Sequence, residues 1–274
     1  MKYVLFTGAT GGLGRCCIEK IVKLGDWTVF AGGTNKAKLE ELEKINNVIP
    51  VELDVTSEES IENVYRTVRE HTDRLDAIVN FAGINELTSM VEGNCVEAIE
   101  KSLNINVMGM VRVNKRFFEM VHIGHGRIIN CSSENGWMTP QPFNGPYTMS
   151  KYAVEAYNDS LRRELMYLDI PVIKIQPGSF KTQITDKAYK DFNKLLETTN
   201  YYKRVLTIME PIMAIEIEHS HNPSKLAKKV VSALTSKLPH TKYKVCTGKL
   251  LLALEFLPDK VVDIAYKALV KIKK

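Results

Sequence analysis

The chain has 274 residues, 45% of them hydrophobic and 25% charged, and this ordinary globular composition excludes a disordered or collagen-like protein. The net charge of +5 is uneven, because residues 223–274 carry +9 and residues 1–222 carry −4. A nucleic-acid-binding protein is more often basic along one whole face, so we expect no nucleic-acid partner.

Features that the sequence lacks indicate its cellular setting. The five cysteines contain no C-x-x-C pair, which indicates reduced thiols and no metal site. Met1 leads into an apolar strand pattern without the regions of a signal peptide, and no apolar run approaches the ~20 residues of a membrane span. We therefore expect a soluble, cytoplasmic protein without a membrane span.

Short β-branched runs alternate with amphipathic helical patterns along most of the chain. The runs cover residues 3–6, 28–30, 48–53, 77–80, 127–131 and 172–175. Between them apolar residues recur at helical spacing, as in Ile61, Val64 and Val68. This alternation predicts an α/β fold, a Rossmann-like doubly wound parallel sheet in a single domain over residues 1–274.

The rhythm changes after Pro177 and Gly178. A long apolar and aromatic segment is followed by a predicted helix over residues 224–236, a short strand over 242–246 and terminal helices. Ligands of open α/β sheets bind outside the carboxyl ends of the strands. We therefore expect a catalytic core, residues 1–182, and a C-terminal helical extension, residues 183–274, that serves as a substrate lid.

A glycine-rich segment connects the first predicted strand to the first helix. It reads Thr7-Gly8-Ala9-Thr10-Gly11-Gly12-Leu13-Gly14. Glycine permits positive φ angles and lets backbone N–H groups at a helix N-terminus approach a pyrophosphate. The spacing is G-x-x-x-G-x-G rather than the common G-x-G-x-x-G, so the segment alone fits either a phosphate loop or a plain tight connection.

Two polar segments follow later strands at the same edge of the predicted sheet. Asp54, before Val55, either accepts a hydrogen bond from an adenine amino group or serves as a loop or helix-cap aspartate. Asn80-Phe81-Ala82-Gly83 closes the fourth strand with small residues. This composition suits a backbone that lies beside a cofactor, and it suits an ordinary turn equally.

Tyr147 and Lys151 stand four residues apart on a predicted helix, so both side chains share one face. A nearby ammonium lowers the pKa of a tyrosine, which fits Lys151 as the tuning group and Tyr147 as the proton donor or acceptor. The same spacing also occurs on solvated helix faces, so the pair alone does not decide between the two interpretations.

Ser133 and Asn106 complete the candidate catalytic set. Ser133 follows the fifth strand, where a hydroxyl can hydrogen-bond a substrate carbonyl. Asn106 lies inside a helical stretch, a position that disfavours asparagine unless its side chain has a specific partner. Capping of a helix kink is the alternative role for Asn106.

Together and in this order, the motifs resemble the short-chain dehydrogenase/reductase family over residues 1–182. The resemblance rests on the glycine segment, Asp54, Asn80-Phe-Ala-Gly83, Asn106, Ser133, Tyr147-x-x-x-Lys151, and Pro177-Gly178 with Thr182. It implies an NAD(P)-dependent alcohol dehydrogenase or ketone reductase. The cofactor-binding positions that it implies are Gly8, Thr10, Gly12, Leu13, Gly14, Asp54, Val55, Asn80, Ala82, Gly83, Tyr147, Lys151, Pro177, Gly178 and Thr182. Thr34 and Asn35, which follow the second strand, are two further candidates for binding the cofactor.

The resemblance also implies a role for each catalytic side chain. Tyr147 would exchange the proton, Ser133 would polarise the carbonyl, and Lys151 would lower the tyrosine pKa while holding the nicotinamide ribose. Asn106 would anchor a water that leads protons to Lys151, and Thr182 would hold the carboxamide. The sequence departs from the family pattern at Phe81, and Ser133 and Tyr147 lie 14 residues apart, one more than in the commonest members. Ser132 is therefore the fallback for Ser133.

The segment after the second strand bears on the choice of cofactor. Ala31-Gly32-Gly33-Thr34-Asn35-Lys36 holds no acidic residue to grip the adenine ribose and no arginine for a 2′-phosphate. Small residues leave room, and Thr34, Asn35, Lys36 and Lys38 can serve a phosphate, although the lysines also fit a solvated helix start. We therefore favour NADP(H) slightly over NAD(H).

The extension is similar to that of the 17-beta-hydroxysteroid and retinol dehydrogenase branch, and Pro142-Phe143-Asn144 resembles the estradiol type. This resemblance implies a bulky apolar alcohol or ketone, a hydroxysteroid first, with a retinoid, fatty-acyl or xenobiotic carbonyl as the alternative. A non-catalytic dinucleotide-binding regulator is the least favoured interpretation. The candidates for the pocket wall, each of which also fits plain core or lid packing, are Trp137, Met138, Phe143, Phe180, Met209 and Met213.

The basic C-terminus predicts an amphipathic helix with lysines beside its apolar residues, namely Lys260, Lys267, Lys271, Lys273 and Lys274. Such a helix either packs on the protein's own lid, which we favour, or makes a weak contact with an anionic membrane surface. By family resemblance, helices over residues 96–121 and 147–168 predict a homodimer or homotetramer.

Overall fold

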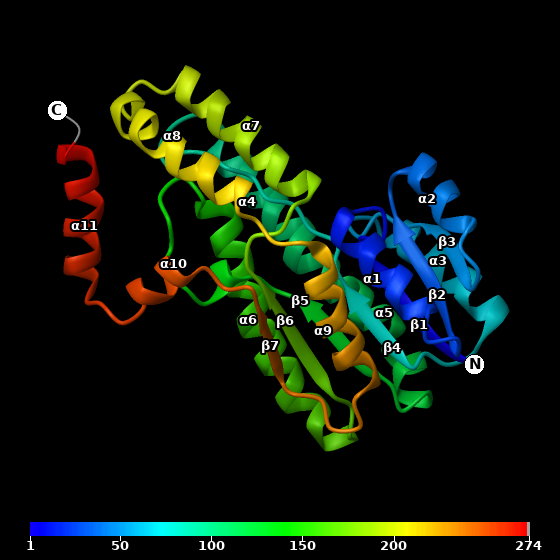
Figure 1. Ribbon diagram of the computed structural model, residues 1–274. Coiled ribbons are helices and arrows are strands. Elements are labelled where there is room, and N and C mark those ends of the chain that lie inside the picture. Colours follow the sequence, from blue (N-terminus) through cyan, green and yellow to red (C-terminus); the bar gives the residue numbers. More distant parts are fainter. Residues whose placement is uncertain (273–274) are drawn as a thin grey trace.

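The computed structural model describes residues 1–272 and contains one parallel sheet of seven strands (Figure 1). Their spatial order is β3-β2-β1-β4-β5-β6-β7. The order reverses between β1 and β4, the point at which such sheets bind ligands. This topology confirms the predicted doubly wound sheet. The strands are β1 (Lys2–Thr7), β2 (Trp27–Gly33), β3 (Val48–Glu52), β4 (Ala77–Asn80), β5 (Arg127–Cys131), β6 (Val172–Pro177) and β7 (Lys242–Val245).

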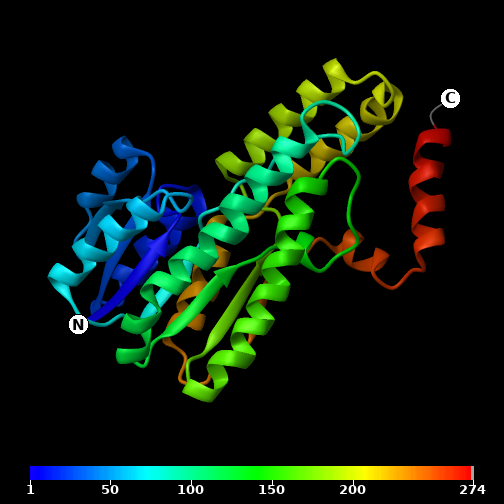
Figure 2. The same ribbon diagram turned by 180° about the vertical axis from the view of Figure 1, so that it is seen from behind.

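Helices cover both faces of the sheet because successive strand residues point to opposite sides. On β1, Val4 and Phe6 join the core under α1 and α9, whereas Leu5 joins the core under α3 and α5. Figure 2 shows α5 and α6 along this second face. The helices of the two layers are α1 (Gly12–Val22), α2 (Lys36–Glu43), α3 (Glu58–His71), α5 (Gly109–Ile123), α6 (Gly145–Leu165) and α9 (Pro223–Thr235).

The predicted helix over residues 96–121 is not continuous. It consists of α4 (Cys95–Leu103), a π-helical turn (Asn104–Met108) and α5. The turn contains Asn106, whose side chain is bonded outside its own helix, and single π turns often occur at functional sites. The helical stretch was predicted, and its change to π-helical geometry lies at the residue for which the sequence indicated either a specific task or a helix kink.

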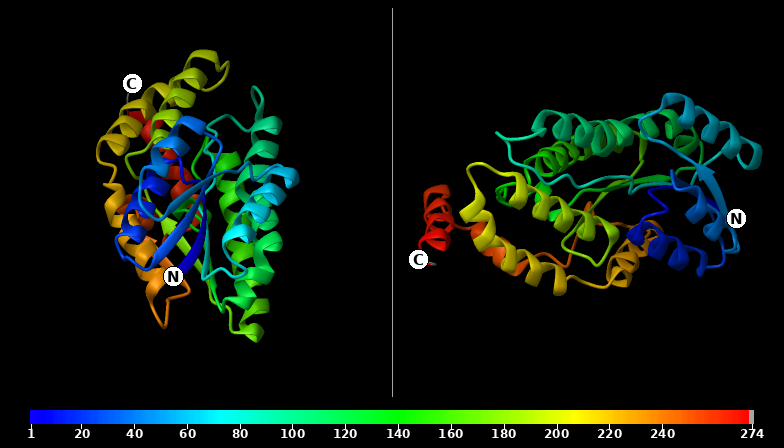
Figure 3. Two further views of the ribbon diagram at one scale, coloured as in Figure 1. Left: turned by 90° about the vertical axis from the view of Figure 1, so that its right-hand side faces the viewer. Right: turned by 90° about the horizontal axis from the view of Figure 1, so that it is seen from above.

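The extension begins with two helices, α7 (Gln183–Thr198) and α8 (Lys203–Glu218), which lie side by side beyond the carboxyl ends of the strands (Figures 1 and 3). Phe192 and Leu195 of α7 and Leu206 of α8 form a small apolar core with Phe143. The chain then returns to the sheet through α9 and β7. The extension is thus joined to the core at both its beginning and its middle.

The last two helices are α10 (Lys249–Leu254) and α11 (Asp259–Ile272). Helix α11 lies beside α8, where Arg204 donates a hydrogen bond to the carbonyl of Val270 (3.2 Å). Val262 is buried, whereas Ile264 is 64% exposed. This placement agrees with packing on the lid. The membrane contact stays a prediction, and Lys273 and Lys274 lie outside the described residues.

Among residues 1–272, no helix combines the length and the apolar composition that crossing a bilayer requires. The homodimer or homotetramer expected through α4, α5 and α6 stays a prediction.

Candidate active site

The glycine segment folds into a tight loop against the end of β4. Gly8 has a φ of 72°, and a Cβ atom there would lie 2.6 Å from the Ala82 nitrogen. The Thr7 hydroxyl accepts hydrogen bonds from the backbone N–H groups of Phe81 and Ala82, at 3.1 Å each. Helix α1 has no capping side chain, so its N-terminal N–H groups remain available for an anion. The loop therefore fits a bound pyrophosphate.

A cavity of about 640 Å³ extends from this loop to the extension. One part, which we call the strand half, is formed by residues at the carboxyl ends of the strands. It brings together nearly all of the predicted cofactor positions: Gly8, Thr10, Gly12, Leu13, Gly14, Thr34, Asn35, Asp54, Val55, Ala82, Gly83, Tyr147, Lys151, Pro177, Gly178 and Thr182.

Asn80 is the exception among these positions, because it does not line the cavity. It is buried, and its Nδ2 donates to Oδ1 of Asn114 (2.7 Å) and of Asn130 (2.9 Å). As the last residue of β4, it directs its side chain toward α5, which carries Asn114. Asn80 was predicted to contact the cofactor, but its side chain belongs to a buried network of asparagine amides.

The adenine-side candidates hold different positions at the cavity rim. Lys36 forms an ion pair with Glu52 (3.1 Å), whereas Lys38 lines the cavity and donates to Oε1 of Gln183 on α7 (2.7 Å). Asp54 is exposed, and its Oδ1 accepts hydrogen bonds from the backbone N–H and the hydroxyl of Thr56. Lys38 is therefore the lysine of this segment that can meet a phosphate.

Tyr147, Ser133 and Lys151 converge on one wall of the cavity. Burial raises the pKa of Tyr147 above its ordinary value, and a hydrogen bond with Ser133 opposes this rise. The Lys151 Nζ lies 5.5 Å from the tyrosine ring centroid and donates to the carbonyl of Cys131 (3.0 Å). Burial therefore has the largest influence on the pKa of Tyr147, and Ser133 has the next largest. We had expected the charge of Lys151 to be the main influence.

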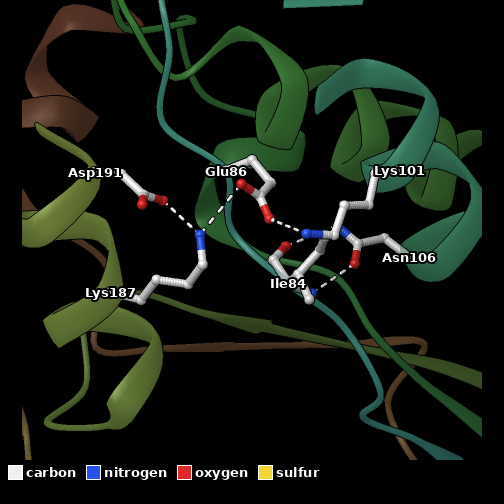
Figure 4. Close-up of polar contacts among 6 residues, drawn as sticks. All are labelled: Ile84, Glu86, Lys101, Asn106, Lys187 and Asp191. Atoms are coloured by element: carbon white, nitrogen blue, oxygen red, sulfur yellow. Dashed lines mark hydrogen bonds and ion pairs between the residues drawn. The ribbon is translucent and has the colours of Figure 1, made fainter. Parts of the chain in front are cut away.

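Asn106 is fully buried and does not line the cavity (Figure 4). Its Oδ1 accepts from the Ile84 N–H (2.8 Å), and its Nδ2 donates to the Ile84 carbonyl (2.9 Å) and to the Ser150 hydroxyl (2.9 Å). A Cβ on Gly83 would lie 3.1 Å from Asn106 Oδ1 and 3.8 Å from Lys151 Nζ. The absence of a side chain at Gly83 therefore leaves a small space between these two polar groups.

The other part of the cavity, which we call the lid half, is formed by Asn85, Glu134, the loop around Phe143, Phe180 and residues of α7 and α8. Four of the six predicted pocket residues line it: Phe143, Phe180, Met209 and Met213. Trp137 and Met138 do not. The Trp137 ring lies under Lys244, with Nζ 3.2 Å from the ring centroid, and Met138 is buried with its carbonyl accepting from the Tyr152 hydroxyl (2.8 Å).

Two carboxylates of the lid half were missed by the sequence reasoning, although their positions were visible. Glu134 directly follows Ser133, and Glu216 lies at helical spacing from Met209 and Met213 on α8. Burial raises the pKa of Glu134 to about 7, and the negative charge of Glu216 adds to the rise. Acidic side chains do not fit an expected apolar pocket, which is why neither was proposed.

A chain of ion pairs joins the lid to the core (Figure 4). Lys187 of α7 donates to Glu86 (3.2 Å) and to Asp191 (2.6 Å), and Glu86 also accepts from Lys101 of α4 (2.9 Å). Glu86 follows the β4 segment that borders the cavity. These contacts, which we call the lid latch, hold α7 over the cavity.

Comparison with known proteins agrees with this geometry. The family model described as short chain dehydrogenase matches residues 2–193. The chain belongs to the short-chain dehydrogenase/reductase family. The protein is accordingly an NAD(P)-dependent oxidoreductase that acts on an alcohol or ketone.

Individual members of the short-chain dehydrogenase/reductase family match most of the chain. Mouse "Retinol dehydrogenase 16" and rat "17-beta-hydroxysteroid dehydrogenase type 6" are each 32% identical, over 96% of this chain and 86% of theirs. The "NADPH-dependent 3-dehydrocapnine reductase" of Ornithobacterium rhinotracheale is 30% identical over 99% of both chains. These matches confirm the hydroxysteroid and retinol dehydrogenase branch that the sequence predicted.

A short-chain dehydrogenase from Burkholderia cenocepacia J2315, solved in complex with NADP, shares the same fold. It superposes with a TM-score of 0.73 at 20% identity, covering 97% of this chain and 98% of that one. At this identity the likeness concerns the fold alone, and it includes the extension as well as the core.

Proposed function

We propose that this enzyme interconverts a ketone and a secondary alcohol on a bulky apolar lipid, using NADP(H). The observation that carries the proposal is the position of Tyr147, Ser133 and Lys151 between a glycine cradle and a largely apolar lid half. When bound, the nicotinamide cofactor supplies or accepts the hydride at the carbinol carbon.

The chain's own residues supply the proton chemistry. Ser133 hydrogen-bonds the substrate oxygen and orients it toward Tyr147, which donates the proton during ketone reduction. The Lys151 Nζ lies 5.5 Å from the Tyr147 ring centroid, and its positive charge favours the phenolate that remains. Ser133 and Lys151 are buried, which limits competing water. A water held between Asn106 and Lys151 beside Gly83 would replace the lost proton.

The strand half supports the preference for NADP(H). No acidic side chain follows β2, and Thr34, Asn35 and Lys38 border the cavity where a 2′-phosphate would bind. The relative named as an NADPH-dependent reductase supports the same choice. The test compares kcat/KM for NADPH and NADH. We expect NADPH to be preferred, and a tenfold preference for NADH would overturn this part of the proposal.

The substrate class has a leading and a second candidate. A hydroxysteroid leads, because Phe143, Phe180, Met209 and Met213 offer a bulky apolar wall and a 17-beta-hydroxysteroid dehydrogenase is among the relatives. A lipid ketone with a polar substituent is the second, favoured by Glu134 and Glu216 in the lid half. A steroid skeleton provides no positive charge to pair with two carboxylates.

A panel of steroid, retinoid and long-chain aliphatic ketones, assayed with both reduced cofactors, tests the proposed reaction. Oxidation of NADPH that depends on a bulky ketone is the expected result. No turnover of any ketone would contradict the proposal and would favour a dinucleotide-binding regulator.

A further inference from the structure

The lid half is rich in hydrogen-bond acceptors that lack partners. Glu134 is 4% exposed and lines the cavity, and a single donor, the Gly248 N–H, reaches its Oε2 (2.8 Å). The Oδ1 atoms of Asn85 and Asn144 are buried without a hydrogen-bond partner, and both residues line the same cavity. A buried polar atom without a partner is costly, so these oxygens indicate a ligand that donates hydrogen bonds.

The charge of this region is also uncompensated. Glu216 faces the cavity from α8, close enough that its charge raises the pKa of Glu134. Within the part of the chain that the structure describes, no lysine or arginine forms an ion pair with either carboxylate. Lys187, a cation on the cavity wall, is already held by Glu86 and Asp191. The buried carboxyl group of Glu134 therefore has room in the cavity for a cationic or hydrogen-bond-donating partner from a ligand.

We propose that the physiological substrate is a lipid ketone, or the matching alcohol, that carries a basic amine close to the reacting carbon, and that Glu134 binds this ammonium. The proposal rests on the oxidoreductase function above and specifies its substrate. Glu134 adjoins Ser133 in the chain, which brings the ammonium near the carbonyl oxygen that Ser133 orients. Glu216 of α8 adds a second negative charge to the same cavity, and the apolar lid residues take the hydrocarbon chain.

A structural role for Glu134 is the competing explanation. Its hydrogen bond to the Gly248 N–H ties the segment before α10 to the catalytic serine loop. The two roles make different demands on the side chain. A glutamine at this position keeps an oxygen that can accept from Gly248 and removes only the charge, so Glu134→Gln separates substrate recognition from anchoring.

The first experiment measures kcat and KM for three long-chain ketones that differ only in the α-substituent: a primary amine, a hydroxyl and a hydrogen. We expect the wild type to favour the amino ketone. Glu134→Gln should lower kcat/KM for the amino ketone by about 30-fold or more, mainly through KM, and leave the unsubstituted ketone within about threefold. Glu216→Gln should have the smaller effect, because Glu216 is more exposed.

Glu197→Gln provides the matched control, because it removes the same charge from an exposed position on α7 away from the cavity. Equal efficiency of the wild type toward the three ketones, or a loss in Glu134→Gln that is the same for all three, would overturn the proposal. The second outcome would assign Glu134 to anchoring.

A binding experiment tests the proposal without turnover. Calorimetry with the NADPH-loaded enzyme compares dodecylamine with dodecanol. Tighter binding of the amine to the wild type, lost in Glu134→Gln and kept in Glu197→Gln, would support ammonium recognition even if no ketone in the panel were reduced. Equal binding of the two compounds would refute it, whether or not the oxidoreductase function holds.

Discussion

The strand half and the lid half of the cavity are built in different ways. The strand half is made by backbone and small residues at strand ends. Gly8 lets the loop lie directly against the backbone of Phe81 and Ala82, and Gly83 leaves Asn106 and Lys151 unobstructed. The lid half is made by large side chains from segments far apart in the sequence, such as Phe143 and Met213. It follows that the strand half selects its ligand by shape, whereas the lid half selects its ligand by the chemistry of its side chains.

The largest effect is expected from a substitution that prevents the proton transfer without altering either half of the cavity. Tyr147→Phe should lower kcat by about 10²- to 10⁴-fold, because it removes the hydroxyl that donates the proton in the proposed mechanism. NADPH affinity, measured by fluorescence titration, should change by less than about threefold. Tyr167→Phe, at an exposed tyrosine, is the control. Substantial activity in Tyr147→Phe would reassign the acid.

The next effect concerns the backbone of the strand half. Gly8→Ala should lower the free energy of unfolding by about 2–4 kcal/mol and abolish cofactor binding, because the new Cβ meets the backbone of Phe81 and Ala82 at positive φ. Gly25→Ala is matched, since Gly25 also has positive φ but open space around it, and should cost only about 1 kcal/mol. Urea unfolding measures both. Equal losses would show that the close approach at Gly8 is unimportant.

The stability of the protein should depend on pH through Glu134, which belongs to the lid half. The pKa of Glu134 is about 7 in the folded protein, above its ordinary value of 4.5, so the folded state binds more protons between these values. Its contribution to stability is therefore greatest at low pH and falls as the pH rises from about 4.5 to 7, by at most about 3 kcal/mol. Relative to wild type, Glu134→Gln should gain stability as the pH rises from 5 to 8. A constant difference in urea unfolding would contradict this sign.

The smallest effect concerns the lid latch. Lys187→Met removes the link between α7 and Glu86, and exposed ion pairs contribute at most about 1 kcal/mol. We expect a rise of a few fold in KM for a bulky ketone with little change in melting temperature. Lys190→Met, which removes a nearby exposed lysine of α7, serves for comparison. Identical KM values in the two variants would show that the latch does not position the lid.

Sequence reasoning succeeded where a residue's role depends on its neighbours in the chain. The glycine segment, Ser133, and the Tyr147 and Lys151 pair each lie at a strand end or on a helix face that local pattern reveals. It failed for Trp137 and Met138, which were expected as apolar wall residues of the pocket and do not line the cavity. Trp137 instead packs under Lys244 and Met138 is buried, and these contacts involve residues that no local pattern covers.

Asn106 illustrates both a success and a failure of prediction from the sequence. The sequence indicated that an asparagine inside a helix needs a specific partner, and the structure supplies that partner in Ile84 and Ser150. The π-helical turn that accommodates it was not predictable, because it forms only when the loop after β4 lies against the helix.

The sequence by itself determined the parallel sheet, the family and the catalytic motif, because periodicity, glycine and residue spacing act within a few residues along the chain. Tertiary structure alone decided which apolar side chains face the cavity and that Glu134 and Glu216 share it. The physical reason is that burial and electrostatic pairing depend on which surfaces meet. Glu134, from the loop after β5, and Glu216, from α8, are far apart in the sequence, and only the fold brings both to one cavity.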